Sequence, residues 1–205
     1  MNPVRSFPPS ARPDAVVLLL GSMPGEASLK AGQYYAHPRN AFWPIMEAVL
    51  DIRRDLPYGE RLAVLAERRI ALWDVLASCV RPGSLDSSIL GSTVVPNDFP
   101  GFFRTHALIR TVFFNGAKAE QAWKRSVAPS LPDLGLQLVR LPSTSPAHAG
   151  LSLQQKIDVW RAVTEAARQG TSPKRRSSAS LSKVAILGLG CHPERMRRIS
   201  GLSLS

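Results

Sequence analysis

The chain alternates between short apolar runs and longer segments in which apolar residues recur every three to four positions. Short runs bounded by Gly, Asn or Pro indicate buried strands, and the wider spacing indicates helices. Strands are predicted at residues 15–20, 70–76, 109–114 and 136–141. Helices are predicted at residues 41–52, 58–68, 97–106, 117–126 and 151–168, with Asn97 or Asp98 capping the third of them.

Because strands alternate with helices, the pattern predicts an α/β fold: a three-layer α/β/α sandwich with a central four-stranded, mainly parallel sheet. Continuous aliphatic runs such as residues 15–20 suit a parallel sheet that is covered on both faces. Ligands of such sheets bind at the carboxyl ends of the strands. The loops expected at that edge are residues 21–25, 74–81, 115–116 and 142–148.

Composition divides the chain into three segments. Residues 1–14 are rich in Pro and polar groups and are expected to be loose, and residues 15–170 are expected to form one folded domain. Residues 171–205 are basic and of low complexity, so a disordered tail is expected there. This tail holds +6 of the net charge of +11. The excess favours a polyanionic partner, nucleic acid or an anionic membrane, although a solvated basic surface explains it equally well.

Cysteine content and hydropathy exclude several classes of protein. Two cysteines, Cys79 and Cys191, cannot form a disulfide scaffold, a thiolate zinc site or an iron–sulfur cluster. No apolar run reaches the length of a membrane-spanning helix, and the run at residues 15–20 is too short for a signal peptide. A cytoplasmic, reduced protein without a metal or cofactor is therefore expected.

The richest chemistry lies in residues 34–43, which read Tyr-Tyr-Ala-His-Pro-Arg-Asn-Ala-Phe-Trp. Aromatic rings beside a glycine-rich turn suit stacking on a planar ring, and an amide suits hydrogen bonding to a base edge or a water. Phe42 and Trp43 are interpreted as core residues at a helix start. Tyr34 and Tyr35 are expected to line a cleft.

The other three strand-end loops are weak signals when each is taken alone. Residues 21–25 (Gly-Ser-Met-Pro-Gly) could offer backbone N–H groups to a ligand or form a plain turn. Residues 115–116 (Asn-Gly) could read a base edge or make a turn. Residues 141–146 (Leu-Pro-Ser-Thr-Ser-Pro) offer hydroxyls for a phosphodiester. The motifs of serine hydrolases and zinc deaminases are absent from the sequence.

Taken in order, the motifs at residues 21–25, 35–43, 114–116 and 141–146 resemble those of the uracil-DNA glycosylase superfamily. Within it the chain looks most like the hypoxanthine-DNA (deoxyinosine) glycosylase branch, which residues 72–79 and 83–87 also resemble. The resemblance covers about residues 15–167. It implies a monofunctional enzyme of base excision repair that flips out a deaminated base and hydrolyses its N-glycosidic bond.

The resemblance also implies a role for each matched position. Met23 stands where other branches carry the water-orienting Asp or Asn, and the branch resemblance places the catalytic amide at Asn40. Tyr35 matches the ring that stacks on the flipped base, and Asn115 matches the residue that reads its edge. The other implied base-binding positions are Gly21, Ser22 and Met23, and the implied DNA-binding positions are His37, Pro142, Ser143, Thr144, Ser145 and His148.

Two functional alternatives stay open. The same scaffold serves glycosylases for uracil or mismatched thymine, and a catalytically inactive DNA-binding module would share much of the pattern. Leu141 occupies the position of a His that stabilises the leaving base in other branches, and His148 is displaced from it. The expected partner is DNA containing deaminated bases, bound by a monomer with no membrane association.

Overall fold

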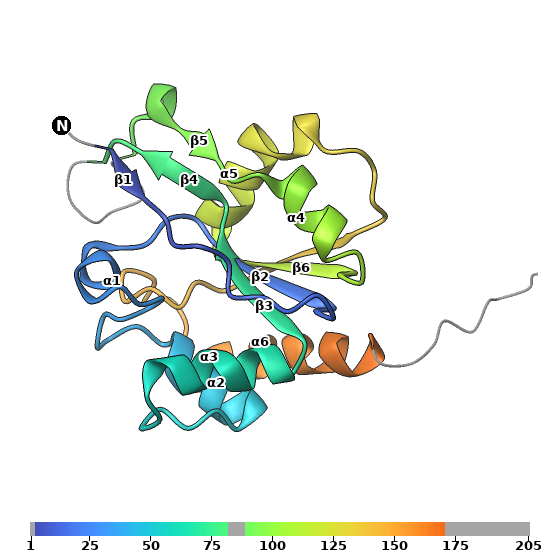
Figure 1. Cartoon of the computed structure of the whole chain (residues 1–205). Coiled ribbons are helices and arrows are strands. Elements are labelled where there is room, and N and C mark those ends of the chain that lie inside the picture. The colour runs from blue at the N-terminus through green and yellow to red at the C-terminus, as the bar shows by residue number, and fades with distance from the viewer. Residues whose placement is uncertain (1–2, 82–88, 171–205) are drawn as a thin grey trace, which may run out of the picture. The chain divides into compact units, whose positions relative to one another are not determined.

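The computed structural model describes residues 3–81 and 89–170, so the predicted tail at 171–205 and the matched segment 83–87 lie outside the described residues. A four-stranded sheet in the order β3-β2-β6-β7 forms the centre (Figure 1). Its strands are β2 (Val17–Gly21), β3 (Ile70–Asp74), β6 (Thr111–Asn115) and β7 (Gln137–Leu141). All three pairings are parallel, which confirms the predicted sheet.

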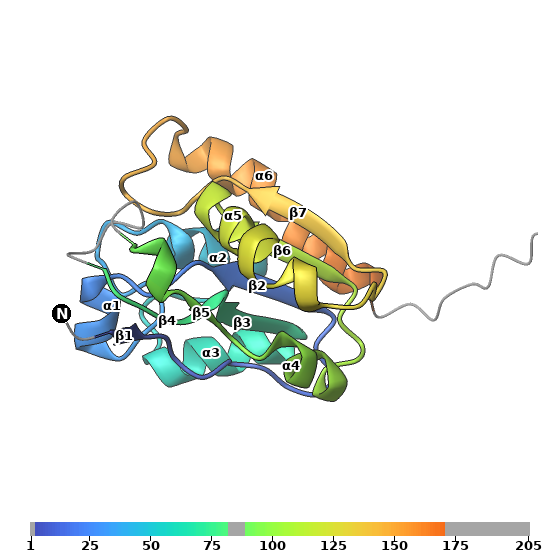
Figure 2. The ribbon, with the colours of Figure 1, turned by 90° about the horizontal axis from the view of Figure 1, so that it is seen from above.

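Helices cover both faces of this sheet, as the three-layer prediction requires (Figures 1 and 2). One face carries α2 (Phe42–Leu50), α3 (Tyr58–Glu67) and α6 (Leu153–Gln169). The other carries α4 (Phe99–Thr105) and α5 (Ala117–Ser126). Side chains of β2 alternate between the two cores: Val17 and Leu19 join the first, and Leu18 and Leu20 join the second.

A second, smaller sheet was not predicted. It contains β1 (Val4–Arg5), β4 (Leu76–Cys79) and β5 (Val95–Pro96), paired antiparallel in the order β1-β4-β5. Together with a bridge between Ser10 and Leu72, it corrects the expectation of a loose N-terminal segment for residues 3–14. Backbone hydrogen bonds, rather than an apolar pattern, order this segment, and composition does not reveal them.

Short elements complete the described chain. The helix α1 (Glu26–Ala31) was not among the predicted helices, and it ends at Gly32, whose φ of 62° suits glycine. Two 3-10 turns are also present, at Gly91–Thr93 and Ala128–Ser130. The predicted strand at 70–76 divides in two. Its first part, β3, ends at Asp74, Val75 still donates its N–H to the carbonyl of Gly21 in β2 at 2.9 Å, and Leu76 begins β4 of the small sheet.

The cap of α4 gives a test of this fold. Asp98 is the cap, since its Oδ1 accepts a hydrogen bond from Gly101 N at 2.9 Å, whereas the Asn97 amide donates to the Asp74 carbonyl. Asp98→Ala is expected to lower the free energy of unfolding by about 1 kcal/mol in urea denaturation. Asp98→Ser keeps a capping oxygen and should recover most of the loss. Equal stabilities of the two variants would contradict this assignment.

Candidate active site

The predicted motifs meet at the carboxyl edge of the central sheet. Gly21 at the end of β2 lies beside Asp74 at the end of β3, and Asn115 at the end of β6 lies beside Leu141 at the end of β7. The loops that leave these strands therefore share one edge, as parallel pairing demands. This edge is where an α/β sheet binds its ligand.

Thr144 connects three of the motifs. Its side chain is buried, and its Oγ1 accepts a hydrogen bond from Asn115 Nδ2 at 2.8 Å. Its backbone N–H donates to Asn115 Oδ1, also at 2.8 Å. Its carbonyl accepts from the N–H of Ala41 at 2.9 Å. One residue thus holds the start of α2, the end of β6 and the loop after β7 in a fixed arrangement.

Both polar atoms of the Asn115 side chain hold Thr144 in this arrangement. An amide has a second N–H hydrogen and a second lone pair beyond these two bonds. Sequence reasoning assigned Asn115 to the base edge, and that role stays a prediction. The structure adds that Asn115 anchors the loop, a role that no local sequence signal reveals because the partners are 29 residues apart.

Asn40 is fixed at the entrance to α2. Its Oδ1 accepts from Phe42 N at 2.9 Å, and its own N–H donates to the His37 carbonyl at 2.8 Å. The side chain is half-buried. Since a carbonyl oxygen has two lone pairs, Oδ1 can accept a second hydrogen bond, from a water, without leaving Phe42.

Tyr35 lies next to this amide with its backbone in the left-handed region, at φ 56°. Its ring stacks on Phe42 with the centroids 4.0 Å apart and the planes 20° apart. Its hydroxyl reaches Gly21, where an added Cβ would lie 3.1 Å from it and would collide with Asp74 Oδ1. Glycine at position 21 therefore lets two polar side chains approach the end of β2.

Asp74 is a candidate site residue that sequence reasoning missed. Its carboxyl group is buried at the end of β3, beside Gly21 and near the Tyr35 hydroxyl. Burial of the Tyr34 hydroxyl raises the pKa of Tyr34, and the negative charge of Asp74 raises it further. The only signal in the sequence was a carboxylate that ends an apolar strand, in a loop region already expected at the binding edge.

The neighbouring aromatic residues belong to the core. Phe42 and Trp43 are buried, as predicted. Tyr34 was expected to line a cleft, but it is only 4% exposed and its hydroxyl lies within hydrogen-bonding distance of the carbonyls of Phe7 and Pro8. Adjacent residues in an irregular segment point in different directions, and only Tyr35 of the pair reaches the edge of the sheet.

Backbone contacts hold the turn at residues 21–25. Leu76 donates its N–H to the Ser22 carbonyl at 3.1 Å, and Arg81 donates to the Pro24 carbonyl at 2.7 Å. The side chain of Met23 is buried in the core on the side of α4 and α5. Met23 can therefore meet a ligand only through its backbone, whereas sequence reasoning placed it simply among the base-binding positions.

The loop at residues 142–148 rests on α6. Trp160 Nε1 donates to the Pro142 carbonyl at 3.0 Å, and Lys156 Nζ donates to the His148 carbonyl at 2.7 Å. Ser143 Oγ and Ser145 Oγ accept from backbone N–H groups two residues further on. These bonds give the loop a defined shape with the imidazole of His148 on its exposed part. His37 is half-buried, and its Nδ1 accepts from Arg39 N.

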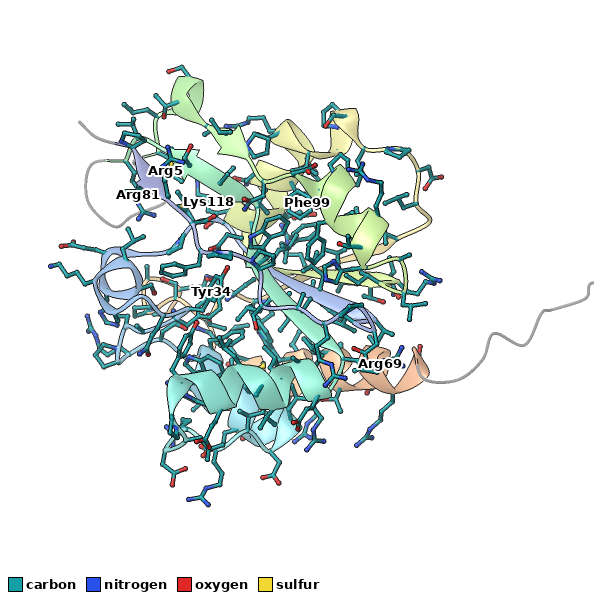
Figure 3. The ribbon with its side chains drawn as sticks, in the orientation of Figure 1. Arg5, Tyr34, Arg69, Arg81, Phe99 and Lys118 are labelled. Carbon is teal, nitrogen blue, oxygen red and sulfur yellow. The ribbon has the colours of Figure 1, made fainter. Side chains whose placement is uncertain are left out.

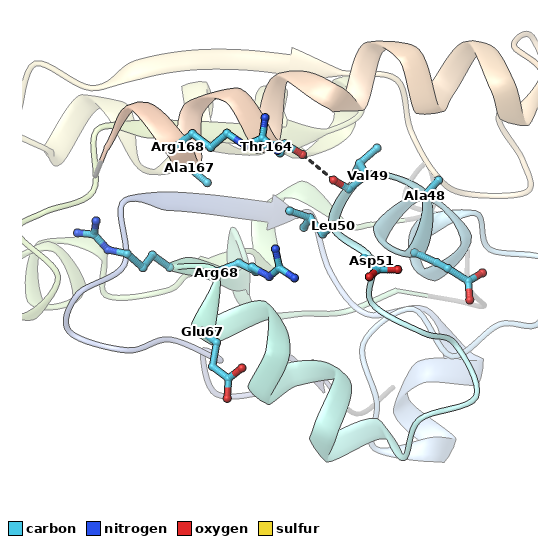
Figure 4. Close-up of a pocket in the computed structure, with 11 residues that line it drawn as sticks. Ala48, Val49, Leu50, Asp51, Glu67, Arg68, Thr164, Ala167 and Arg168 are labelled. Atoms are coloured by element: carbon cyan, nitrogen blue, oxygen red, sulfur yellow. Dashed lines mark hydrogen bonds between the residues drawn. The ribbon is translucent and has the colours of Figure 1, made fainter. Parts of the chain in front are cut away.

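A pocket of about 480 Å³ lies away from this edge, where α2, α3 and α6 end (Figure 4). Both acidic and basic side chains line it, among them Glu47, Arg68 and Arg168. Arg69, which precedes β3, also lines the pocket. Its guanidinium donates hydrogen bonds to the carbonyls of Asp14 and Gly170. This is the amino end of the strands, so we do not assign the pocket to the active site.

Residues 3–81 and 89–170 contain no cluster of three or more His, Cys, Asp or Glu side chains that could hold a metal ion. Over the same ranges no helix combines the length and apolar character needed to cross a bilayer.

Comparison with known proteins identifies the family. The model of the uracil DNA glycosylase superfamily matches residues 8–164, so the chain belongs to that superfamily. Its fold also matches a solution NMR structure of a Methanosarcina acetivorans protein described as a candidate uracil DNA glycosylase, with a TM-score of 0.68 and 33% identity. The match covers 82% of this chain and 99% of that one.

Two similar proteins carry a more specific name, hypoxanthine DNA glycosylase. The one from Methanosarcina acetivorans is 34% identical over 160 residues, which are 78% of this chain and 96% of the relative. The one from Methanosarcina barkeri is 31% identical over 157 residues, or 76% and 94% of the two chains. The resemblance seen in the motifs is thereby confirmed.

The Thr144 contacts give a prediction about stability. Thr144→Val removes the hydroxyl and leaves Asn115 Nδ2 without that acceptor, so the free energy of unfolding should fall by about 1–2 kcal/mol in urea denaturation. Thr144→Ser keeps the hydroxyl and should lose less. If Thr144→Ser and Thr144→Val lower the free energy of unfolding equally, the hydrogen bond between Asn115 and Thr144 does not account for the loss of stability.

Lys156 gives a prediction about pH. Burial lowers the pKa of this amine below its usual value of 10.5. The unfolded chain therefore binds more protons between the lowered pKa and 10.5, and wild-type stability should rise with pH in that window relative to Lys156→Met. Urea unfolding of both proteins at a series of alkaline pH values measures the difference. Parallel pH profiles would contradict the shift.

Proposed function

We propose that this chain is a monofunctional DNA glycosylase that excises deaminated bases, with hypoxanthine as the preferred one. Membership of the superfamily and the names of the two similar hypoxanthine DNA glycosylases support this proposal. The observation on which the proposal depends is the set of three hydrogen bonds made by Thr144. They connect the segment that contains Asn40 to Asn115 and to the loop at 142–148. The site is built from one chain, so a monomer suffices.

Base flipping comes first in the proposed mechanism. Extruding a nucleotide costs a few kcal/mol and costs least at a weak pair such as one containing inosine. Stacking on an aromatic ring offsets about 1–3 kcal/mol of this cost. Tyr35 is the proposed ring, since it is held against Phe42 and its hydroxyl lies near Gly21. The base would then lie on the side of Tyr35 away from Phe42.

Hydrolysis follows when a water oxygen bonds to C1′ and the bond from C1′ to the base nitrogen breaks. The electron pair of that bond leaves with the base, and the water loses a proton to solvent. Asn40 cannot take up a proton at neutral pH, so it contributes by holding the water in line with C1′ through Oδ1. Backbone N–H groups of residues 21–25 are the proposed donors to the departing base.

Asp74 contributes to base choice in this proposal. A carboxylate accepts hydrogen bonds and donates none, so at the base-binding edge it favours a base with an N–H group there. Hypoxanthine has such a group at N1, and uracil has one at N3. The carboxylate alone does not separate the two bases, and uracil excision is therefore the second candidate activity.

A base-release assay with an Asn40 variant tests the proposal. Labelled duplexes carrying inosine, uracil, xanthine or a G·T mismatch are incubated with excess enzyme and then treated with alkali. Wild type should cleave the inosine duplex fastest, and only after alkali, because the proposed mechanism uses water and not a lysine amine as the nucleophile. Asn40→Ala should lose about 100-fold or more in the single-turnover rate, since the water is no longer positioned.

Asn40→Asp is the matched control, because its carboxylate still accepts from Phe42 N and preserves the helix start. It should unfold at nearly the wild-type urea concentration and release base faster than the alanine variant. Cleavage mainly at uracil would keep the reaction and overturn the preferred base. DNA binding with no cleavage of any duplex would instead indicate the inactive binding module.

A further inference from the structure

A groove of about 220 Å³ lies beside the carboxyl edge, between α5 and the small β4–β5 sheet. Ser22 lies at one side of it, one residue after Gly21 of the base-binding turn. Lys118, Gln121 and Arg125 line it from α5, which begins directly after Asn115 and Gly116. We call these four residues the α5 groove. Its position makes it continuous with the proposed active site.

The α5 groove is positively charged. Lys118 (Figure 3) and Arg125 are exposed, and neither has an ion-pair partner among residues 3–81 and 89–170. No described residue that lines the groove is acidic. The next face of α5 differs, because Lys124 there is paired with Glu120 at 2.6 Å and Arg140 binds the same carboxylate at 3.3 Å.

Helical spacing places the groove residues in one row. Positions 118, 121 and 125 are three and seven residues apart, which puts them on the same face of α5. Seven residues of helix rise about 10 Å, and one DNA strand advances about 3.4 Å along its axis per phosphate. The two cations, separated by about 10 Å along α5, can therefore meet different phosphates of a single strand.

We propose that the α5 groove binds the phosphodiester backbone of the DNA strand that carries the target base. The inference rests on the proposed function, because it needs DNA at the carboxyl edge. Charge complementarity and continuity with Ser22 identify the occupant as the flanking backbone. Lys118 and Arg125 would then hold the strand while the base is extruded, and they would add affinity without choosing a sequence.

Salt dependence of DNA binding tests the inference. Lys118→Gln with Arg125→Gln is compared with wild type, using a duplex that carries a stable abasic-site analogue. The slope of log K against log salt should become shallower by about 2, one for each lost phosphate contact, and Kd near physiological salt should rise about tenfold.

A control of equal charge is Lys124→Gln with Arg104→Gln, which alters the ion-paired face of α5 and the last turn of α4. Its slope should match wild type. If both double variants change the slope equally, the effect comes from net charge, and the groove proposal is overturned. If wild type releases base but the groove variant binds DNA as wild type does, the groove proposal is overturned and the proposed function stands.

If wild type binds DNA and releases no base, the proposed function is overturned. The comparison of salt slopes between wild type and the groove variant then still tests whether the groove binds DNA.

Methylphosphonate linkages locate the contact on the DNA. Replacing single phosphates on the target strand by neutral linkages should weaken wild-type binding at positions flanking the lesion. The groove variant should be insensitive at those same positions. Equal sensitivity of both proteins at every position would contradict the proposed contact.

Discussion

The pair of hydrogen bonds between Asn115 and Thr144 is the constraint on which the site depends. Each residue both donates and accepts, so the loop after β7 and the end of β6 are fixed relative to each other in translation and in rotation. Ala41 then bonds to the Thr144 carbonyl and positions the start of α2. Asn40 is therefore placed by Thr144, more than 100 positions further along the chain, and the sheet supplies the rigid base for both.

The support for this arrangement comes from the layer behind it. Trp160 and Lys156 on α6 hold the loop at 142–148 through its carbonyls, while the apolar face of the same helix packs on the sheet. Burial of Lys156 removes its amine partly from water, which costs free energy. The hydrogen bond from this amine to the His148 carbonyl offsets part of the desolvation cost. Core packing and site geometry thus share one helix.

Sequence reasoning succeeded where a long periodic pattern exists. The four parallel strands and α5 follow from apolar runs and helical spacing, and the order of the motifs pointed to the superfamily. It failed for residues 3–14, because a two-residue strand such as β1 carries no periodicity. It also could not separate Tyr34 from Tyr35, or foresee the buried place of Asp74, because those depend on contacts between segments distant in the chain.

Two helices start at the carboxyl edge, α2 just after Asn40 and α5 just after Gly116. The first turn of a helix exposes unpaired N–H groups equivalent to about half a positive charge. These helix starts therefore contribute a positive potential to the edge that arises from the backbone itself. Such a field can stabilise a departing base anion through backbone dipoles alone, and stabilisation of this kind needs no nucleophilic side chain. The architecture thereby separates electrostatic stabilisation from covalent trapping of the abasic product.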